Sequence, residues 1–252
     1  MLNIVIPMAG LGSRFANAGY RDPKPLIGIH GVPMINLVIR NLSPSMAHRF
    51  IFICQAQHIL AYELDAKLKS WAPGCEIIEL NGVTEGAACT VLNARHLIDN
   101  DAPLMIANSD QYVDISIDEY LAVSAQTQYD GMIMTMTADD PKWSYAGIGD
   151  YGLVSRVVEK EVISSEATVG IYNFSRGSDF VRAADEMIAK DLRVNNEFYV
   201  APVYNEMISE GARIGIYNIG EEGAGMYGLG IPSDLDTFAR LPLSKRVCEG
   251  VL

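Results

Sequence analysis

Short apolar runs alternate with amphipathic stretches along the first half of the chain, and this alternation predicts βαβ units on a parallel sheet. The β-branched run Ile4-Val5-Ile6 opens the series, and Met34 to Leu42 follows with the period of a helix. The same order then continues with strands at 50–53, 76–80 and 104–107 and helices at 59–71, 87–98 and 117–125. Units of this kind favour right-handed crossovers, which place helices on the faces of the sheet.

The second half of the chain carries more apolar runs with fewer helical segments between them. Strand-like runs lie at 131–137, 153–158, 168–174 and 213–219, and helical periods lie at 178–188 and 199–208. Consecutive strands without intervening helices are typical of antiparallel pairing. We therefore expect an α/β fold, a doubly wound, mostly parallel Rossmann-like mixed sheet with a small antiparallel addition. No linker, repeat or low-complexity segment interrupts residues 1–252, so we predict a single domain.

Two glycines and two cations stand close together directly after the first strand. Gly10 and Gly12 let the backbone turn and bring amide groups close to an anion, and Arg14 and Lys24 add positive charge. A Walker loop requires Gly-Lys-Ser/Thr, which this segment lacks, and a dinucleotide fingerprint requires a small residue where Phe15 stands. The segment therefore indicates a polyphosphate site that neither of these glycine loops describes.

The same residues form a two-part motif, which reads Gly10-Leu11-Gly12-Ser13-Arg14 and then Pro23-Lys24-Pro25-Leu26. This pattern resembles that of the sugar-phosphate nucleotidylyltransferases, also called NDP-sugar pyrophosphorylases, and weaker likenesses continue across nearly the whole chain. The resemblance implies a fold of the nucleotide-diphospho-sugar transferase type, with the antiparallel addition on the acceptor side. It also implies catalysis by Arg14 and Lys24 and nucleotide binding by Ala9, Gly10, Gly12 and Ser13.

Polar residues follow other predicted strands, at the edge where parallel α/β sheets bind ligands. Asp110 comes after the strand at 104–107, and its carboxylate can hold Mg²⁺ against substrate phosphates. Similar families place a metal-binding Asp after such a strand, so Mg²⁺ is the expected cofactor. The alternative is that Asp110 only caps the next turn.

The loop at 84–88 combines small residues with one hydroxyl group. In the resembling families this loop contacts the nucleobase, which assigns nucleotide binding to Thr84 and Gly86. The alternative is a plain helix cap, in which Thr84 accepts from the free amides of the next helix.

Five residues are assigned to acceptor binding by the resemblance: Glu159, Lys160, Gly170, Asn196 and Glu197. A Glu-Lys pair would contact the sugar and phosphate of an acceptor, and Asn and Glu side chains bind hydroxyl groups well. A Glu-Lys dipeptide is also common on exposed surfaces, so a purely structural interpretation stays open.

One segment departs from the family pattern. The family carries a second metal-binding carboxylate in a late Asp-x-Gly-Thr-Pro segment, and Gly228 stands here in place of that Asp. Asp110 and the substrates could hold the metal alone, Glu222 could substitute, or catalysis could be weakened. We favour the first, because Mg²⁺ commonly needs only one or two carboxylates besides phosphate oxygens and water.

The charge composition excludes some classes of binding partner. The 252 residues carry 19 Lys and Arg against 31 Asp and Glu, a formal net charge of −12. Such a surface repels nucleic acid and anionic membrane, so a phosphate ligand must meet a local basic pocket. We expect neither a leader segment nor a membrane span, because the N-terminal residues enter a strand and no apolar run approaches about 18 residues.

Cysteine and histidine usage points to a reducing compartment and away from metal chemistry based on these residues. The cysteines show no paired short spacing, which favours buried thiols over disulfides or zinc. The histidines share no ligand spacing, so neither a zinc site nor a His-centred hydrolase gains support. We expect a cytoplasmic protein, and self-association into a homo-oligomer stays open.

The resemblance implies that a nucleoside triphosphate and a phosphorylated small molecule, most directly a sugar 1-phosphate, react to give an NDP-linked product and pyrophosphate. It places the chain in nucleotide-sugar and cell-surface polysaccharide biosynthesis. An acceptor phosphate is already anionic near neutral pH and needs no general base. Three alternatives remain: a cytidylyltransferase for a non-sugar alditol or amino-alcohol phosphate, a glycosyltransferase of the related fold, and a non-catalytic nucleotide-binding protein. A glycosyltransferase would use Asp-x-Asp, whereas Asn108-Ser109-Asp110 supplies one carboxylate.

Overall fold

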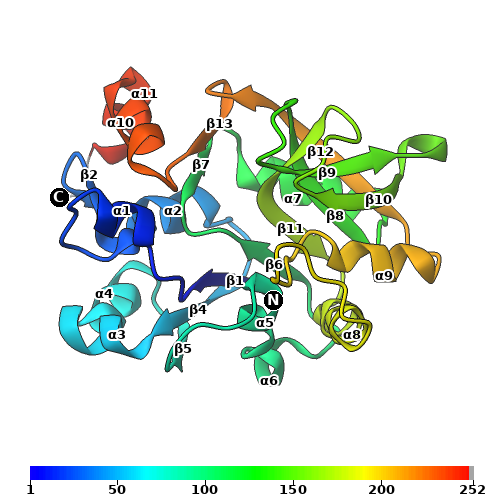
Figure 1. The fold of residues 1–252 in the computed structure, drawn as a ribbon, viewed down its shortest axis with the longest axis horizontal. Helices are drawn as coiled ribbons and strands as arrows, with labels where there is room; N and C mark the ends of the chain where they lie inside the picture. The colour runs from blue at the N-terminus through cyan, green and yellow to red at the C-terminus, as the bar shows by residue number, and fades with distance from the viewer. Residues whose placement is uncertain (250–252) are drawn as a thin grey trace.

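A large mixed sheet forms the centre of the molecule (Figure 1). The computed structural model describes residues 1–249, and within them eleven strands share one sheet, with nine in the order β5-β4-β1-β6-β11-β8-β12-β13-β7 and β9 and β10 attached at β11. The strands of this sheet are β1 (Leu2–Met8), β4 (His48–Gln55), β5 (Glu76–Leu80), β6 (Leu104–Ala107), β7 (Gln111–Val113), β8 (Gly131–Thr137), β9 (Ser144–Ile148), β10 (Val154–Glu159), β11 (Glu166–Phe174), β12 (Ile214–Glu222) and β13 (Gly225–Gly228). A short ribbon of β2 (Gly28–Ile29) and β3 (Val32–Pro33) stands apart.

The helices cover both faces of the sheet. They are α1 (Ser13–Asn17), α2 (Met34–Leu42), α3 (Ala56–Tyr62), α4 (Leu64–Trp71), α5 (Ala87–Leu92), α6 (Arg95–Ile98), α7 (Ile117–Thr127), α8 (Gly177–Ala189), α9 (Val203–Ser209), α10 (Pro232–Arg240) and α11 (Pro242–Cys248). Within residues 1–249, none of these helices combines the length and the apolar character that crossing a membrane requires.

Alternate residues of β1 enter two different cores. Ile4 and Ile6 pack with Val38 of α2, whereas Val5 packs with Val91 of α5 on the opposite face. Side chains of a strand alternate between faces, and a strand covered on both sides is apolar throughout, as the sequence predicts for this segment. The doubly wound arrangement is confirmed.

The sheet divides into a parallel part and a mixed part. β1 runs parallel to β4 and β6, and β4 runs parallel to β5. β11 then runs antiparallel to β6 and β8, and β10 pairs antiparallel with β9 at the right of Figure 1. The expected antiparallel addition is therefore present. The sequence patterns did not predict β7, β9 or β13, which are three to five residues long.

Three of the predicted helices are wrong in extent, and one of them, expected at 199–208, begins only at Val203. The helix expected at 59–71 is divided at Glu63, which takes a left-handed conformation with φ 50°. The division lets α4 bury Leu64 and Leu68 while α3 buries none of its residues. The helix expected at 87–98 ends at Leu92, because Asn93 donates its side-chain amide to backbone carbonyls of the preceding turn and competes with the helical ladder.

The C-terminal helices complete a third core beside the first strand. Phe15 of α1 is buried with Leu235 and Phe238 of α10 and with Tyr112 of β7. In Figure 1, α10 and α11 lie directly beside α1 and β2. This packing brings the segment between β13 and α10 to the glycine loop that follows β1. It also explains why a large residue stands at Phe15, which is 1% exposed.

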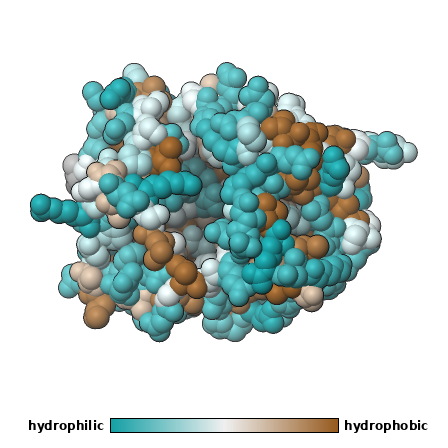
Figure 2. All heavy atoms as spheres, in the orientation of Figure 1, coloured by the Kyte–Doolittle hydropathy of each residue, from teal (hydrophilic) through white to brown (hydrophobic). Residues whose placement is uncertain are grey.

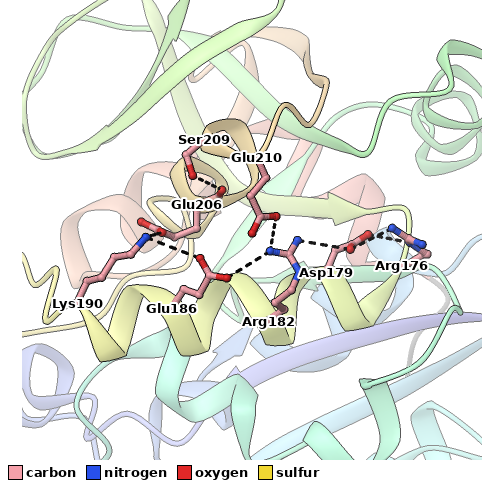
Figure 3. Close-up of polar contacts among 8 residues, drawn as sticks. All are labelled: Arg176, Asp179, Arg182, Glu186, Lys190, Glu206, Ser209 and Glu210. Atoms are coloured by element: carbon pink, nitrogen blue, oxygen red, sulfur yellow. Dashed lines mark hydrogen bonds and ion pairs between the residues drawn. The ribbon is translucent and has the colours of Figure 1, made fainter.

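A row of charged side chains joins α8 to α9 (Figure 3). Arg182 lies 3.7 Å from Asp179 and also contacts Glu210, and Lys190 contacts Glu206, which is buried. An isolated buried carboxylate is costly, so a paired Glu206 holds the two helices in one arrangement. The network lies away from the strand ends, and its role is to fix α9 and the segment that leads into it.

Candidate active site

Four adjoining cavities form one cleft at the carboxyl ends of the parallel strands, and Figure 2 shows the molecule hollowed at the centre of this face. Their volumes are about 340, 400, 210 and 240 Å³. Neighbouring cavities share lining residues: Arg14 belongs to the first and third, Ala87 to the first and second, and Lys24 to the third and fourth. A ligand with several parts could therefore extend through all of them.

Arg14 and Lys24 line the same cavity, together with Gly12, Ser13 and Gly230. Gly12 precedes α1 in a left-handed conformation with φ 62°, which an L side chain rarely adopts. A Cβ atom at this glycine would lie 3.2 Å from the Lys24 side chain, so the glycine allows the two segments to approach closely. Two cations and a tight backbone turn thus converge where sequence reasoning expects a polyphosphate.

Lys24 is paired with Asp110. Its Nζ lies 2.5 Å from Asp110 Oδ2, and each side chain is 24% exposed. The backbone of Asp110 is fixed independently, because its carbonyl accepts a hydrogen bond of 2.8 Å from Leu229 N–H. The ammonium and the carboxylate are therefore held at one point of the cleft, and the Lys24 ammonium, which has three N–H donors, keeps donors free for a phosphate.

The surroundings of Asp110 fit a hard divalent cation. Its carboxylate lines a cavity with Gly10 and Gly12, and a Cβ atom at Gly230 would lie only 2.5 Å from Oδ2, so that glycine keeps the space beside the carboxylate open. Mg²⁺ commonly binds through one or two carboxylates, substrate phosphates and water. Within residues 1–249 no group of three or more His, Cys, Asp or Glu side chains is arranged to hold a metal.

Asp234, and not Glu222, lies against Gly228. A Cβ atom at Gly228 would lie 3.3 Å from Asp234 Oδ2, so this carboxylate occupies the space that a side chain at 228 would enter. Glu222 accepts two hydrogen bonds from Lys142 Nζ, of 3.0 and 3.1 Å. Burial raises the pKa of Asp234 and the negative charge of Glu222 raises it further, while the Ser233 hydroxyl and the positive charges of Lys142 and Arg14 lower it. Asp234 was not predicted as a site residue, because an acidic residue in the first turn of a helix is already explained by its favourable interaction with the helix dipole.

The second cavity is formed by the glycine loop on one wall and by the loop before α5 on the other. Ala9, Gly10, Thr84 and Gly86 line it. The hydroxyl of Thr84 donates to Gly86 C=O at 2.9 Å and pairs with the Thr90 hydroxyl at 2.6 Å. Thr84 accepts no hydrogen bond from the free amides of α5, so the interpretation of this residue as a plain helix cap is wrong.

Gly86 permits a close contact between two backbone segments. Its φ is 129°, and a Cβ atom would lie 2.4 Å from the carbonyl oxygen of Phe198. The contact is reinforced by hydrogen bonds of 2.8 Å from Phe198 N–H to Glu85 C=O and 3.0 Å from Ala88 N–H to Phe198 C=O. This glycine therefore joins the second cavity to the segment that carries Asn196 and Glu197.

The first cavity contains a buried carboxylate and a nearby ammonium. Glu159 ends β10 and accepts a hydrogen bond from the Ser144 hydroxyl, and burial raises the pKa of Glu159. Lys160 Nζ donates to Tyr199 O–H at 2.8 Å. Gly170, in the middle of β11 with φ 79°, lies so close to Asn108 that a Cβ atom would be 2.2 Å from its side-chain nitrogen.

Asn196 and Glu197 are placed differently from the other expected acceptor residues. Glu197 lines the second cavity with the glycine loop, and Asn196 takes a left-handed conformation with φ 63° outside the lining of the four cavities. Sequence reasoning also missed hydroxyl groups in the first cavity, where Ser144, Thr168 and Tyr172 lie together. Two of these follow the alternation of β11, but Ser144 lies in β9, a strand that the patterns did not predict.

Known proteins resemble this chain over most of its length. A family model described as Nucleotidyl transferase matches residues 4–199. The Bifunctional protein GlmU of Methanococcus maripaludis is 25% identical over 179 residues, which cover 68% of this chain and 39% of that protein. The chain therefore spans well under half the length of this curated relative.

Solved structures give the same picture at the level of the fold. The nucleoside-diphosphate-sugar pyrophosphorylase from Vibrio cholerae RC9 has a TM-score of 0.81 and 28% identity, covering 94% of this chain and 100% of that one. UDP-glucose pyrophosphorylase complexed with UDP-glucose has a TM-score of 0.76 at 17% identity, covering 98% and 100%. The inositol-1-phosphate CTP transferase from T. maritima has a TM-score of 0.72 at 13% identity, covering 99% and 97%.

Proposed function

The chain belongs to the nucleotidyl transferase family, and we propose on that premise that it joins a nucleoside triphosphate to a sugar 1-phosphate, giving a nucleoside-diphosphate sugar and pyrophosphate. One observation carries the proposal. The cavity of Arg14 and Lys24 shares Arg14 with the cavity of Glu159 and Lys160, and it adjoins the glycine-loop cavity through the cavity of Asp110. A triphosphate in the centre would thus have room for its base on one side and for an acceptor on the other.

The reaction needs charge neutralisation and alignment more than proton transfer. An oxygen of the acceptor phosphate forms a bond to the α-phosphorus, the bond from that phosphorus to the bridging oxygen of the β-phosphate breaks, and pyrophosphate leaves with the electron pair. Arg14 would bind the leaving pyrophosphate. Lys24 would use its remaining N–H donors to stabilise the charge that develops at the reacting phosphate.

Acceptor alignment falls to the first cavity. Lys160 would hold the acceptor phosphate, while the buried carboxylate of Glu159 would accept hydrogen bonds from hydroxyl groups of the sugar. Asp110 would hold Mg²⁺ with the substrate phosphates, and the ion would supply additional positive charge at the phosphates. Thr84, Gly86 and the glycine loop would surround the base.

A matrix of the four common nucleoside triphosphates against phosphate monoesters tests the proposal, with pyrophosphate release as the readout. The panel should contain sugar 1-phosphates together with alditol and amino-alcohol phosphates. Release confined to sugar 1-phosphates is the expected result. Release with CTP and a non-sugar phosphate alone would establish the cytidylyltransferase alternative instead. Triphosphate binding without release in any pair would refute catalysis of this kind.

Lys24→Ala separates the proposed chemistry from simple binding. Removal of one preorganised electrostatic contact typically lowers kcat by about 10²–10³. Asn3→Ala is a suitable control, because Asn3 is buried at the opposite end of β1 and its side chain contacts only Arg49 among the hydrogen bonds described for residues 1–249. A Lys24→Ala variant with turnover within a few-fold of the parent would contradict the assigned role.

A further inference from the structure

Gln55 joins the two loops that form the walls of the second cavity. It is the last residue of β4, and it is 3% exposed. Its side-chain Nε2 donates one hydrogen bond of 2.5 Å to Ala9 C=O and another of 2.7 Å to Gly82 C=O. The first carbonyl belongs to the glycine loop and the second to the loop before α5, so one planar amide group spans both walls.

This tie has no substitute in the part of the chain that the structure describes. Within residues 1–249, no other hydrogen bond connects segment 9–12 directly with segment 81–86. Both segments are rich in glycine, and Gly82 takes φ 98°, so their own backbones restrict them little. Gln55 therefore supplies the direct hydrogen-bonded tie between the two walls, in addition to the pairing of β4 with β1 and β5 beneath them.

The two walls present apolar side chains at the mouth of the cavity. Leu11 is 66% exposed and Val83 is 61% exposed, and both line the second cavity from opposite loops. The free energy of the complex falls when a flat ring covers apolar side chains that were exposed to water. This stabilisation is largest when the space between the two walls matches the thickness of the ring, because in a wider space the ring loses contacts with one wall.

We propose that Gln55 is a positioning residue that sets the width of the nucleobase cavity and thereby the affinity for the nucleoside triphosphate. The inference rests on the proposed function, because it assumes that the base enters the second cavity. Gln55 touches neither substrate. It would act through Leu11 and Val83, whose loops its side-chain amide ties together.

Gln55→Leu and Gln55→Glu test this role. Leu keeps the approximate size of the side chain and removes both N–H donors, while an ionised Glu places an acceptor against two carbonyl oxygens. For both variants we expect the Kd of the triphosphate, measured by calorimetry without acceptor, to rise about tenfold or more, and the KM for the triphosphate to follow. The KM for the acceptor should change less than twofold.

Asn3→Ala is the matched control, because it also removes a buried polar side chain that bonds within the protein, but at the opposite end of the sheet. It should lower the melting temperature and leave both KM values unchanged. If Gln55→Leu fails to fold, Gln55→Glu carries the test. Unchanged triphosphate binding in a folded, active Gln55 variant would overturn the inference. A wild-type protein that releases no pyrophosphate would instead overturn the proposed function.

Discussion

Replacing Gly86 with Ala places a methyl group where two backbone segments already touch. The new Cβ atom would lie 2.4 Å from the carbonyl oxygen and 2.5 Å from the nitrogen of Phe198, and neither atom belongs to a side chain that could rotate away. The φ of 129° with ψ of 174° is also a conformation open almost exclusively to glycine. The substitution must therefore move the segment of Phe198 away from the loop before α5.

The cost has two parts. A residue held in such a sparsely populated conformation costs about 1–3 kcal/mol. Overpacking against fixed neighbours costs about 1–3 kcal/mol more. The sum of roughly 2–6 kcal/mol is a large part of the total stability of about 5–15 kcal/mol that a folded protein typically has. With roughly 2–4 °C per kcal/mol for a chain of this size, the melting temperature should fall by roughly 5–20 °C.

Gly82→Ala is the matched control for this experiment. Gly82 lies in the same loop with φ 98°, but a Cβ atom there would have no heavy atom within 4 Å. Gly82→Ala therefore has the conformational cost of a positive φ but no steric clash with a neighbouring segment. Thermal melts and urea titrations should place Gly86→Ala below Gly82→Ala by at least about 1 kcal/mol. Equal stability of the two variants would contradict this prediction, because it would mean that the backbone of Phe198 moves away from the new methyl group at little cost.

Further predictions concern pH and thiol reactivity. Burial raises the pKa of Glu159 above that of the unfolded chain, so stability from this group is present at low pH and is lost as the pH rises through the folded-state pKa. Glu159→Gln should therefore melt higher than the parent at about pH 7.5 but close to it at about pH 4, and an equal gain at both would count against the shift. Burial raises the pKa of Cys54 to about 12, so mass spectrometry after brief alkylation at about pH 8 should find Cys54 unmodified. Burial also raises the pKa of Cys75 and Cys89, but these half-buried thiols are partly accessible and should be labelled first. Rapid alkylation of Cys54 would show that β4 opens.

Sequence patterns predicted the features that depend on residues close together in the chain. The run Ile4-Val5-Ile6 is apolar on both sides because both faces of β1 are covered, and Met34–Leu42 carries a complete amphipathic period. The cations Arg14 and Lys24 could be nominated because their motif lies within one short stretch of sequence. The roles of these residues remain predictions, although both line one cavity.

The remaining features depend on contacts between distant segments. β7 and β13 are too short to show a period, and they form through pairing with other strands: β13 lies between β12 and β7, and β7 is the edge strand. Asp234 lies in α10, whose Leu235 and Phe238 are buried together with Phe15 of α1, more than 200 residues earlier in the chain. Gln55 looks like an ordinary polar residue at the end of a strand, and only the folded chain brings two glycine-rich loops to its amide. The conformational preferences of individual residues do not predict these contacts.

β11 has a consequence for how such an enzyme could diversify. This strand is hydrogen-bonded to β6 on one side and to β8 on the other, and it also contacts β9 through Ala167 and Tyr145. β11 thus joins the half of the sheet that holds the glycine loop to the half that carries the β9–β10 hairpin. Main-chain hydrogen bonds on both sides of β11 join the two halves, with one register shift between Thr168 and Tyr172, so the two substrates would be aligned when the protein folds rather than by movement of a lobe. Mutations on the hairpin side could then retarget the acceptor during evolution while the nucleotide half is inherited intact.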